Sequence, residues 1–305
     1  MIRRILSFIL IAAFTFLLQA PAATPIRTMI LDGQSGGPFH AWQQTTPVLK
    51  KILEESGLFQ VDVVTAPPAG GDFSKFKPEF SKYQVVVSNY DGPDDPWPAE
   101  VKSAFEQYMK NGGGLVVVHA ANNSFPGWKA YNLMTGIGGW RNRDEKSGPR
   151  WYLKDGKLVS DPSPGRAGNH GQRLPFQVVI QNGRHPITKG LPKTWLHVAD
   201  ELYDSLRGPG ENMEILATAH SDPANKGTGR DEPMLLVLSF GKGQIFHTIM
   251  GHDVAAMSCV GFIATLQRGT EWAATGKVTV KAPADFPAPD KISVRSNLAA
   301  MQSGK

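Results

Sequence analysis

The chain has 305 residues, a formal net charge of +5 and a hydrophobic fraction of 41%, which is typical of a globular protein with a sizeable core. This composition excludes global disorder, collagen and a coiled coil. The single cysteine excludes a disulfide framework and any zinc module built from cysteines. No basic cluster stands out, so nothing in the sequence indicates nucleic-acid binding.

The first 22 residues have the pattern of a secretory signal peptide. Arg3 and Arg4 precede an apolar run over residues 5–18, and Ala20-Pro21-Ala22 offers small residues for cleavage. The run is shorter than the roughly 20 residues of a membrane-spanning helix. We expect a secreted or periplasmic protein with no stable membrane span after removal of the signal. An uncleaved N-terminal anchor is the alternative.

Short apolar runs alternate with amphipathic segments along the first half of the chain. Strands are expected at residues 27–31, 59–64, 83–88 and 115–118, with helices at 47–55 and 98–110. Continuous apolar strands that alternate with helices predict a parallel sheet covered on both faces, in a single α/β domain.

The second half is less regular. Residues 136–175 are rich in glycine, proline and charged residues, and we expect a long irregular excursion over the surface, near the site. Later strands are expected at residues 176–180, 213–219, 234–239 and 244–249, and a last helix at 259–272. From residue 281 to 305 the chain is rich in proline and alanine, which predicts a flexible tail.

Polar side chains follow several of the expected strands. They are Asp32, with His40 and Trp42 in the loop after it, then Asn89, Tyr90 and Asp91, then His119 and Asn123, and finally His252. In an open parallel sheet, ligands bind beyond the carboxyl ends of the strands. The sequence therefore predicts one site at one edge of the sheet.

The segment 195–203 adds a carboxylate to this set. If the segment is extended, Trp195, His197, Glu201 and Tyr203 share one face. A glutamate in a half-apolar stretch can serve as a general acid or base, or as a ligand. A structural ion pair is the equally weighted alternative.

Several short motifs together resemble one family. They are Leu31-Asp32-Gly33, residues 113–120 (GGLVVVHA), His185-Pro186-Ile187, residues 200–203 (DELY) and Gly243-Gln244-Ile245-Phe246 followed by Gly251-His252-Asp253. Their order and spacing over about residues 26–275 resemble the ThuA-like (trehalose utilisation) family of the class I glutamine amidotransferase-like superfamily. The resemblance implies a flavodoxin-like three-layer α/β/α sandwich with a mostly parallel central sheet.

The same resemblance provides a contrast. In class I amidotransferases the strand that corresponds to residues 115–118 ends in a nucleophilic cysteine, whereas here it ends in His119-Ala120. Cys259 follows the last expected strand, and we interpret it as a buried structural thiol, so thiol-based amide hydrolysis is not expected. Residues 33–38 (GQSGGP) do not match G-x-G-x-x-G, which argues against a nicotinamide site.

We therefore expect a pocket rich in histidine and carboxylate that binds a small-molecule sugar. The predicted catalytic residues are His119, Glu201 and His252, and the predicted substrate-binding residues are Asp32, His40, Trp42, Tyr90, Asn123 and Tyr203. Trp128 and Trp140 could add aromatic walls. Three of the other histidines, His170, His197 and His220, are interpreted as surface or packing residues.

The set His119, Glu201 and His252 could also bind a divalent metal such as zinc, with His40 or His185 as an additional ligand. The resemblance implies hydrolysis or elimination on a 3-keto disaccharide or glycoside that a partner sugar oxidoreductase supplies. A non-catalytic sugar-binding or accessory module is the alternative function. Convergence of the ionisable side chains on one point would favour the enzyme.

Overall fold

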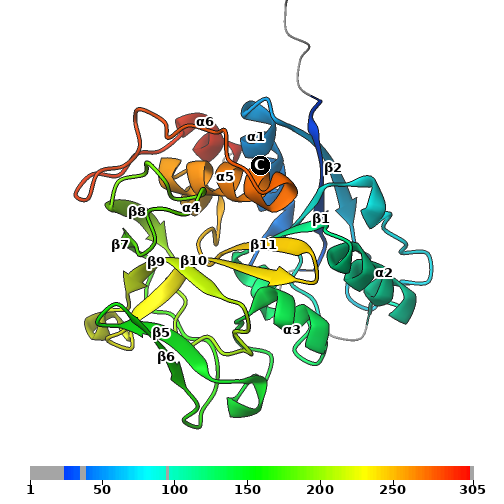
Figure 1. Ribbon diagram of the computed structural model, residues 1–305, viewed down its shortest axis with the longest axis horizontal. Coiled ribbons are helices and arrows are strands. Elements are labelled where there is room, and N and C mark those ends of the chain that lie inside the picture. Colours follow the sequence, from blue (N-terminus) through cyan, green and yellow to red (C-terminus); the bar gives the residue numbers. More distant parts are fainter. Residues whose placement is uncertain (1–23, 35–38, 94–95, 303–305) are drawn as a thin grey trace, which may run out of the picture.

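The computed structural model describes residues 24–34, 39–93 and 96–302 (Figure 1). The signal peptide predicted at residues 1–22 lies outside the described residues. Across the described ranges, no helix is both long enough and apolar enough to span a bilayer.

Five parallel strands form one half of the central sheet. They are β1 (Ile26–Asp32), β2 (Phe59–Thr65), β3 (Val85–Ser88), β4 (Gly114–Val118) and β11 (Gly243–Thr248), in the order β2-β1-β3-β4-β11. Every residue of β3 and β4 is buried, as continuous apolar runs require in a sheet covered on both faces. β4 pairs with parallel neighbours on both sides, so it is a central strand, as predicted.

The other half of the sheet is antiparallel. It continues from β11 through β10 (Asp231–Phe240), β9 (Glu214–His220), β7 (Leu174–Ile180) and β8 (Thr194–Asp200). The residues expected to be irregular, 136–175, contain a hairpin of β5 (Arg150–Lys154) and β6 (Lys157–Asp161), which joins the sheet through β10. The sheet is therefore mixed, with a parallel core.

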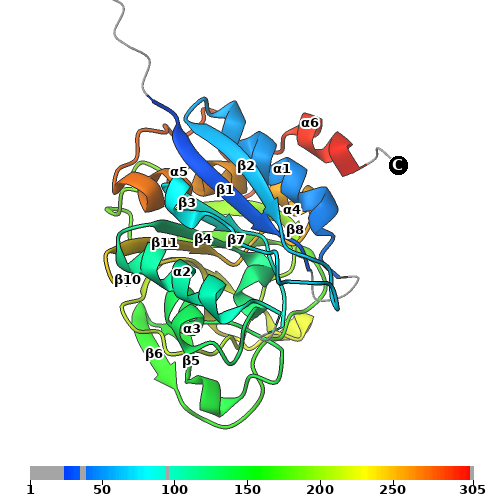
Figure 2. The same ribbon diagram turned by 90° about the vertical axis from the view of Figure 1, so that its right-hand side faces the viewer.

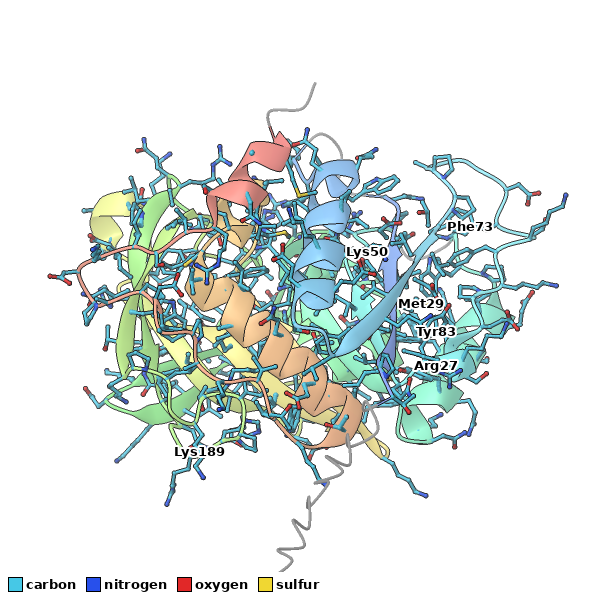
Figure 3. All side chains as sticks on the ribbon, turned by 90° about the horizontal axis from the view of Figure 1, so that it is seen from above. Arg27, Met29, Lys50, Phe73, Tyr83 and Lys189 are labelled. Atoms are coloured by element: carbon cyan, nitrogen blue, oxygen red, sulfur yellow. The ribbon has the colours of Figure 1, made fainter. Side chains whose placement is uncertain are left out.

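Helices cover both faces of the sheet. α1 (Trp42–Glu55) and α5 (Val260–Thr275) lie side by side on one face, together with the short helices α4 (Val254–Met257) and α6 (Ser296–Ala299) (Figures 1 and 3). α2 (Ala99–Lys110) and α3 (Lys129–Thr135) lie on the opposite face (Figure 2). Single 3₁₀ turns occupy Phe80–Lys82, His119–Asn123, Glu145–Ser147, Pro223–Asn225 and Ala300–Gln302. The fold is the three-layer, flavodoxin-like α/β/α sandwich that the sequence predicted.

Both halves of the sheet share one hydrophobic core. Val117 of β4 and Leu236 of β10 are fully buried, and they belong to one continuous cluster of apolar side chains. The described residues do not divide into two cores near residue 175.

The segment 281–302 differs from the flexible tail that its composition predicted. The backbone N–H of Leu196 in edge strand β8 donates to the carbonyl of Ala288 at 2.8 Å, and that of Val260 donates to Ser293 at 2.9 Å. Leu298 is fully buried. The segment is held because the edge strand and the start of α5 provide partners for its backbone, which composition alone does not reveal.

Candidate functional site

His119 is positioned by the end of the central strand. β4 ends at Val118, and His119 begins a 3₁₀ turn with a φ of 46°, in the left-handed region. A non-glycine residue in this region costs on the order of 1–2 kcal/mol, and such strain is concentrated at functional sites. The prediction that His119 lies at a strand-to-helix turn is confirmed.

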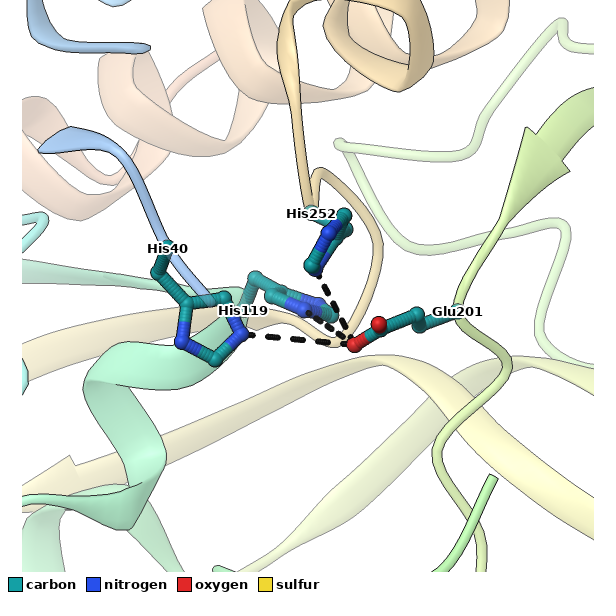
Figure 4. A group of neighbouring side chains, drawn as sticks. All are labelled: His40, His119, Glu201 and His252. Atoms are coloured by element: carbon teal, nitrogen blue, oxygen red, sulfur yellow. Dashed lines mark ion pairs between the residues drawn. The ribbon is translucent and has the colours of Figure 1, made fainter. Parts of the chain in front are cut away.

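Three further side chains converge on His119 (Figure 4). Oε2 of Glu201 lies 3.0 Å from Nδ1 of His252, 3.6 Å from Nε2 of His119 and 4.0 Å from Nε2 of His40. His40 precedes α1, Glu201 follows β8 and His252 follows β11. One donor atom from each of the four residues lies within 4.8 Å of all the others.

Hydrogen bonding prepares His119 to act as a ligand. Its Nδ1 lies 2.6 Å from the carbonyl of Ile249, which can only accept, so Nδ1 carries the proton and Nε2 presents a lone pair. This Nε2 and Nδ1 of His252 are buried, and neither has a hydrogen-bond partner of suitable geometry in the described structure. Buried ring nitrogens without partners that converge on a carboxylate fit a bound cation.

The electrostatics of the four side chains agree with such a role. Burial and the neighbouring His119 and His252 lower the pKa of His40 to about 3, so this ring is neutral. Burial alone would raise the pKa of Glu201, but the neighbouring imidazoles of His119 and His252 outweigh burial and hold this pKa well below its usual range. Burial alone would lower the pKa of His252, yet Glu201 raises it.

Asp200 holds two of these residues in place. Its buried carboxylate accepts backbone N–H groups from Glu201 at 2.8 Å, from Gly251 at 2.7 Å and from His252 at 3.1 Å. It also lies 2.9 Å from Nε2 of His197. His197 is a buried packing residue, as expected, and this bond satisfies its Nε2. It does not share a face with Glu201, as we had expected it to do. β8 ends at Asp200, which interrupts the alternation assumed for residues 195–203.

A cavity of about 350 Å³ opens in front of the cluster. It is lined by Phe39, His40, Asp91, Asn123, Trp140, Arg141, His170, Glu201 and Tyr203. The ring centroid of Tyr203 lies 4.1 Å from that of His119, and its hydroxyl lies 3.0 Å from Nε2 of His40. Burial, together with the charges of Glu201 and Asp91, raises the pKa of Tyr203 well above its usual value, so the hydroxyl keeps its proton.

One wall of the cavity is a strained loop. Trp140, Arg141 and Asn142 have φ values of 52°, 45° and 60°, three consecutive non-glycine residues in the left-handed region. This conformation places Trp140 against Tyr203, with ring centroids 4.4 Å apart. It also lets Arg141 bind Oδ1 of Asp91 through two nitrogens, at 2.6 and 3.0 Å. The aromatic wall that we expected from Trp140 is present.

Some predicted site residues lie elsewhere. Tyr90 is buried and stacks on Phe125, with ring centroids 5.6 Å apart, because an aromatic cluster lies beneath its strand end. Trp128 belongs to the same cluster. Asp32 is buried at the end of β1, does not line the cavity, and is hydrogen-bonded to Thr46 and Thr65. Trp42 does not line this cavity, but it lines a small pocket together with His40, His119 and His252, and a further cavity beside it.

Sequence reasoning missed two polar residues that the structure places in the cavity, Arg141 and His170. Nε2 of His170 lies 3.8 Å from Oε1 of Glu201, whereas we expected a surface or packing residue. Both come from the long excursion, in which no periodicity fixes the direction of a side chain. Of the predicted residues, His40, Asn123, Glu201 and Tyr203 line the cavity directly, and His119 and His252 lie behind it.

The arrangement can hold a divalent metal. Three imidazoles and one carboxylate are a donor set suited to zinc and to other first-row transition metals. Metal bonds of about 2.0–2.2 Å require the longer separations, which reach 4.8 Å, to become shorter, and side-chain rotations can supply this change. The cavity leaves one side of this cluster open to a small molecule.

Comparisons with known proteins agree with the fold. No curated protein matches the chain. The crystal structure of a ThuA-like protein from Parabacteroides merdae is 47% identical with a TM-score of 0.86, and the match covers 90% of this chain and 99% of that chain. A ThuA-like protein from Bacteroides uniformis is 23% identical with a TM-score of 0.55, over 86% and 97% of the two chains, and supports the fold alone. The family model for ThuA, described as trehalose utilisation, matches residues 27–273. The chain therefore belongs to the ThuA family, which indicates a carbohydrate-related role.

Proposed function

We propose that this protein is an exported enzyme that acts on an oxidised sugar at a divalent metal centre. The observation that carries the proposal is the convergence of His40, His119, Glu201 and His252 at the base of a cavity of about 350 Å³. The export part rests on the sequence pattern of residues 1–22.

The lining of the cavity suits a sugar derivative. Phe39, Trp140 and Tyr203 offer aromatic faces to a sugar ring, while Asn123 and Arg141 offer polar groups to hydroxyl or carbonyl oxygens. The carbohydrate-related role of the family points to the same class of substrate.

The proposed reaction is elimination or hydrolysis on a 3-keto disaccharide or glycoside, which a partner sugar oxidoreductase supplies. A ketone at C3 makes the neighbouring C2–H acidic, so a base can take this proton and the substituent at C1 can leave. A metal bound at the cluster would stabilise negative charge that develops on the ketone oxygen. This chemistry requires no thiol, and Cys259 is buried at the start of α5, away from the end of β4.

The proposal is tested by metal analysis and by turnover of 3-ketotrehalose. We expect the purified protein to contain close to one equivalent of a divalent metal, and we expect turnover to slow when the C2 hydrogen is replaced by deuterium. Glu201→Gln keeps the size of the side chain but removes its charge. It should therefore lose metal affinity and turnover while the unfolding midpoint of the metal-free protein changes little.

The matched control is Glu211→Gln, since Glu211 is exposed and does not line the cavity. Full activity of Glu201→Gln would remove Glu201 from the mechanism, and a large loss of stability would favour a structural ion pair. Binding of the sugar by the wild-type protein without any turnover would favour the sugar-binding module instead.

A further inference from the structure

The proposed reaction needs a base that is not occupied by the metal. If His40, His119, Glu201 and His252 bind the ion, the acceptor nitrogens of the three imidazoles are engaged, and the positive ion makes the carboxylate of Glu201 a weak base. The other titratable side chains that line the cavity are those of Asp91, Arg141, His170 and Tyr203. The base has to come from this second group.

Three members of the group are poorly suited to take a proton. The carboxylate of Asp91 is buried and engaged by two nitrogens of Arg141. The guanidinium of Arg141 stays protonated and has no lone pair to offer. The hydroxyl of Tyr203 is already engaged, because it lies 3.0 Å from Nε2 of His40.

His170 has the geometry of a base. Its Nδ1 lies 2.8 Å from the carbonyl of Gly171, which can only accept, so Nδ1 carries a proton and Nε2 is the nitrogen that presents a lone pair in the neutral ring. This Nε2 lies 3.8 Å from Oε1 of Glu201, whereas the other three histidines lie close to Oε2. The side chain is 36% exposed, so a substrate in the cavity can reach it.

The backbone beside His170 is firmly held. Asn169 and Asp204 exchange two backbone hydrogen bonds, at 3.1 and 2.9 Å. The amide of Asn169 also donates to the carboxylate of Asp204 at 3.0 Å. The ring of His170 lies 6.1 Å from those of both Trp140 and Tyr203, measured between centroids. A group held in this way beside a substrate pocket is preorganised for proton transfer.

We infer that His170 is the general base of this site, which rests on the proposed function. Nε2 of His170 takes the proton from C2 of the 3-keto sugar, and the electron pair of that C–H bond forms a C1=C2 double bond. The C1–O bond breaks, and its electron pair leaves with the oxygen. The protonated His170 then returns the proton to this oxygen, so the products are an unsaturated keto sugar and an alcohol.

Chemical rescue tests the inference. His170→Ala should lower turnover of 3-ketotrehalose by about 10²- to 10⁴-fold, the range for loss of a general base. Its metal content and circular dichroism should match the wild type. Added imidazole should restore much of the rate, because the side chain opens into a cavity that a small base can enter. His170→Gln should show the same loss, since glutamine fills the space but is not a base.

The control is His220→Ala, because His220 is exposed and forms a surface pair with Asp231. It should keep the wild-type rate and should not respond to imidazole. Turnover of His170→Ala within about threefold of the wild type would overturn the inference. A loss of turnover that is accompanied by loss of bound metal, or that imidazole does not restore, would also overturn it. A wild-type protein that does not turn over the keto sugar would instead overturn the proposed function, and the inference with it.

Discussion

Replacing Asp200 by asparagine should disturb the site from within the core. Each oxygen of this buried carboxylate accepts two hydrogen bonds. Oδ1 accepts from Glu201 and His252, and Oδ2 accepts from Gly251 and His197. Asparagine has the same shape but only one oxygen, so its NH₂ group would face two donors. The substitution therefore removes two accepted bonds and leaves His197 without its negative partner.

The expected loss of stability is large. Burial disfavours the charged imidazole of His197, but the neighbouring Cys259 and the carboxylate of Asp200 outweigh it and raise the pKa of His197 to about 10. Two charge-assisted hydrogen bonds contribute about 1.5–3 kcal/mol each. Removing one partner of a buried ion pair costs about 3–5 kcal/mol, and we expect Asp200→Asn to lower the free energy of unfolding by that amount.

Urea unfolding of the metal-free protein at pH 7 measures this loss, and titration calorimetry measures metal affinity. Because Asp200 orients Glu201 and His252, affinity should fall by about 10- to 100-fold. The matched control is Asp231→Asn, which removes the carboxylate of an exposed aspartate–histidine pair and should change stability by less than about 1 kcal/mol. A loss below 1 kcal/mol for Asp200→Asn, with unchanged metal affinity, would show that other contacts hold the two ligands.

Two further predictions concern the pH dependence of stability and the loop before His252. Burial raises the pKa of Glu232 to about 7, so its charged form is disfavoured in the folded chain, and stability should decline as pH rises from about 4.5 through 7. Glu232→Gln should remove a decline of about 2–3 kcal/mol between urea unfolding curves at pH 5 and pH 8, and an unchanged pH profile would contradict this assignment. Gly251 has a φ of 108°, and a Cβ there would lie 2.7 Å from the ring of Phe262. Gly251→Ala should lower stability by about 1–3 kcal/mol and weaken metal binding, and wild-type affinity in calorimetry would show that the loop adapts.

The sequence predicted the parts of the fold that local pattern controls. The apolar run before His119 allowed only a central buried strand, and the rule for the ends of parallel strands then placed His119 and His252 at the same edge. The antiparallel pairing of β9, β7 and β8 was not predicted, because the periodicity of a strand does not reveal the direction of its partner. The hairpin of β5 and β6 was not predicted for the same reason.

The site was predicted less completely, because side-chain direction depends on contacts between distant residues. Asp32 and Tyr90 follow strands of the parallel half, as His119 does, yet neither lines the cavity. Glu201 was identified by assuming that the strand alternation continues through residue 201, but β8 ends at Asp200. Glu201 is instead positioned by the hydrogen bond from its backbone N–H to Asp200. His170 depends on the pairing of Asn169 with Asp204, 35 residues away, and no local signal marks it.

The four converging side chains also tie together remote parts of the chain. His40, His119, Glu201 and His252 are separated from one another by at least 50 residues. His40 and His119 belong to the parallel half of the sheet, whereas Glu201 follows the antiparallel edge strand β8. An ion held by all four would close three long loops and act as a cross-link between the halves. Such a link cannot form before both halves have assembled, so release of the ion would report the cooperative unfolding of the whole domain.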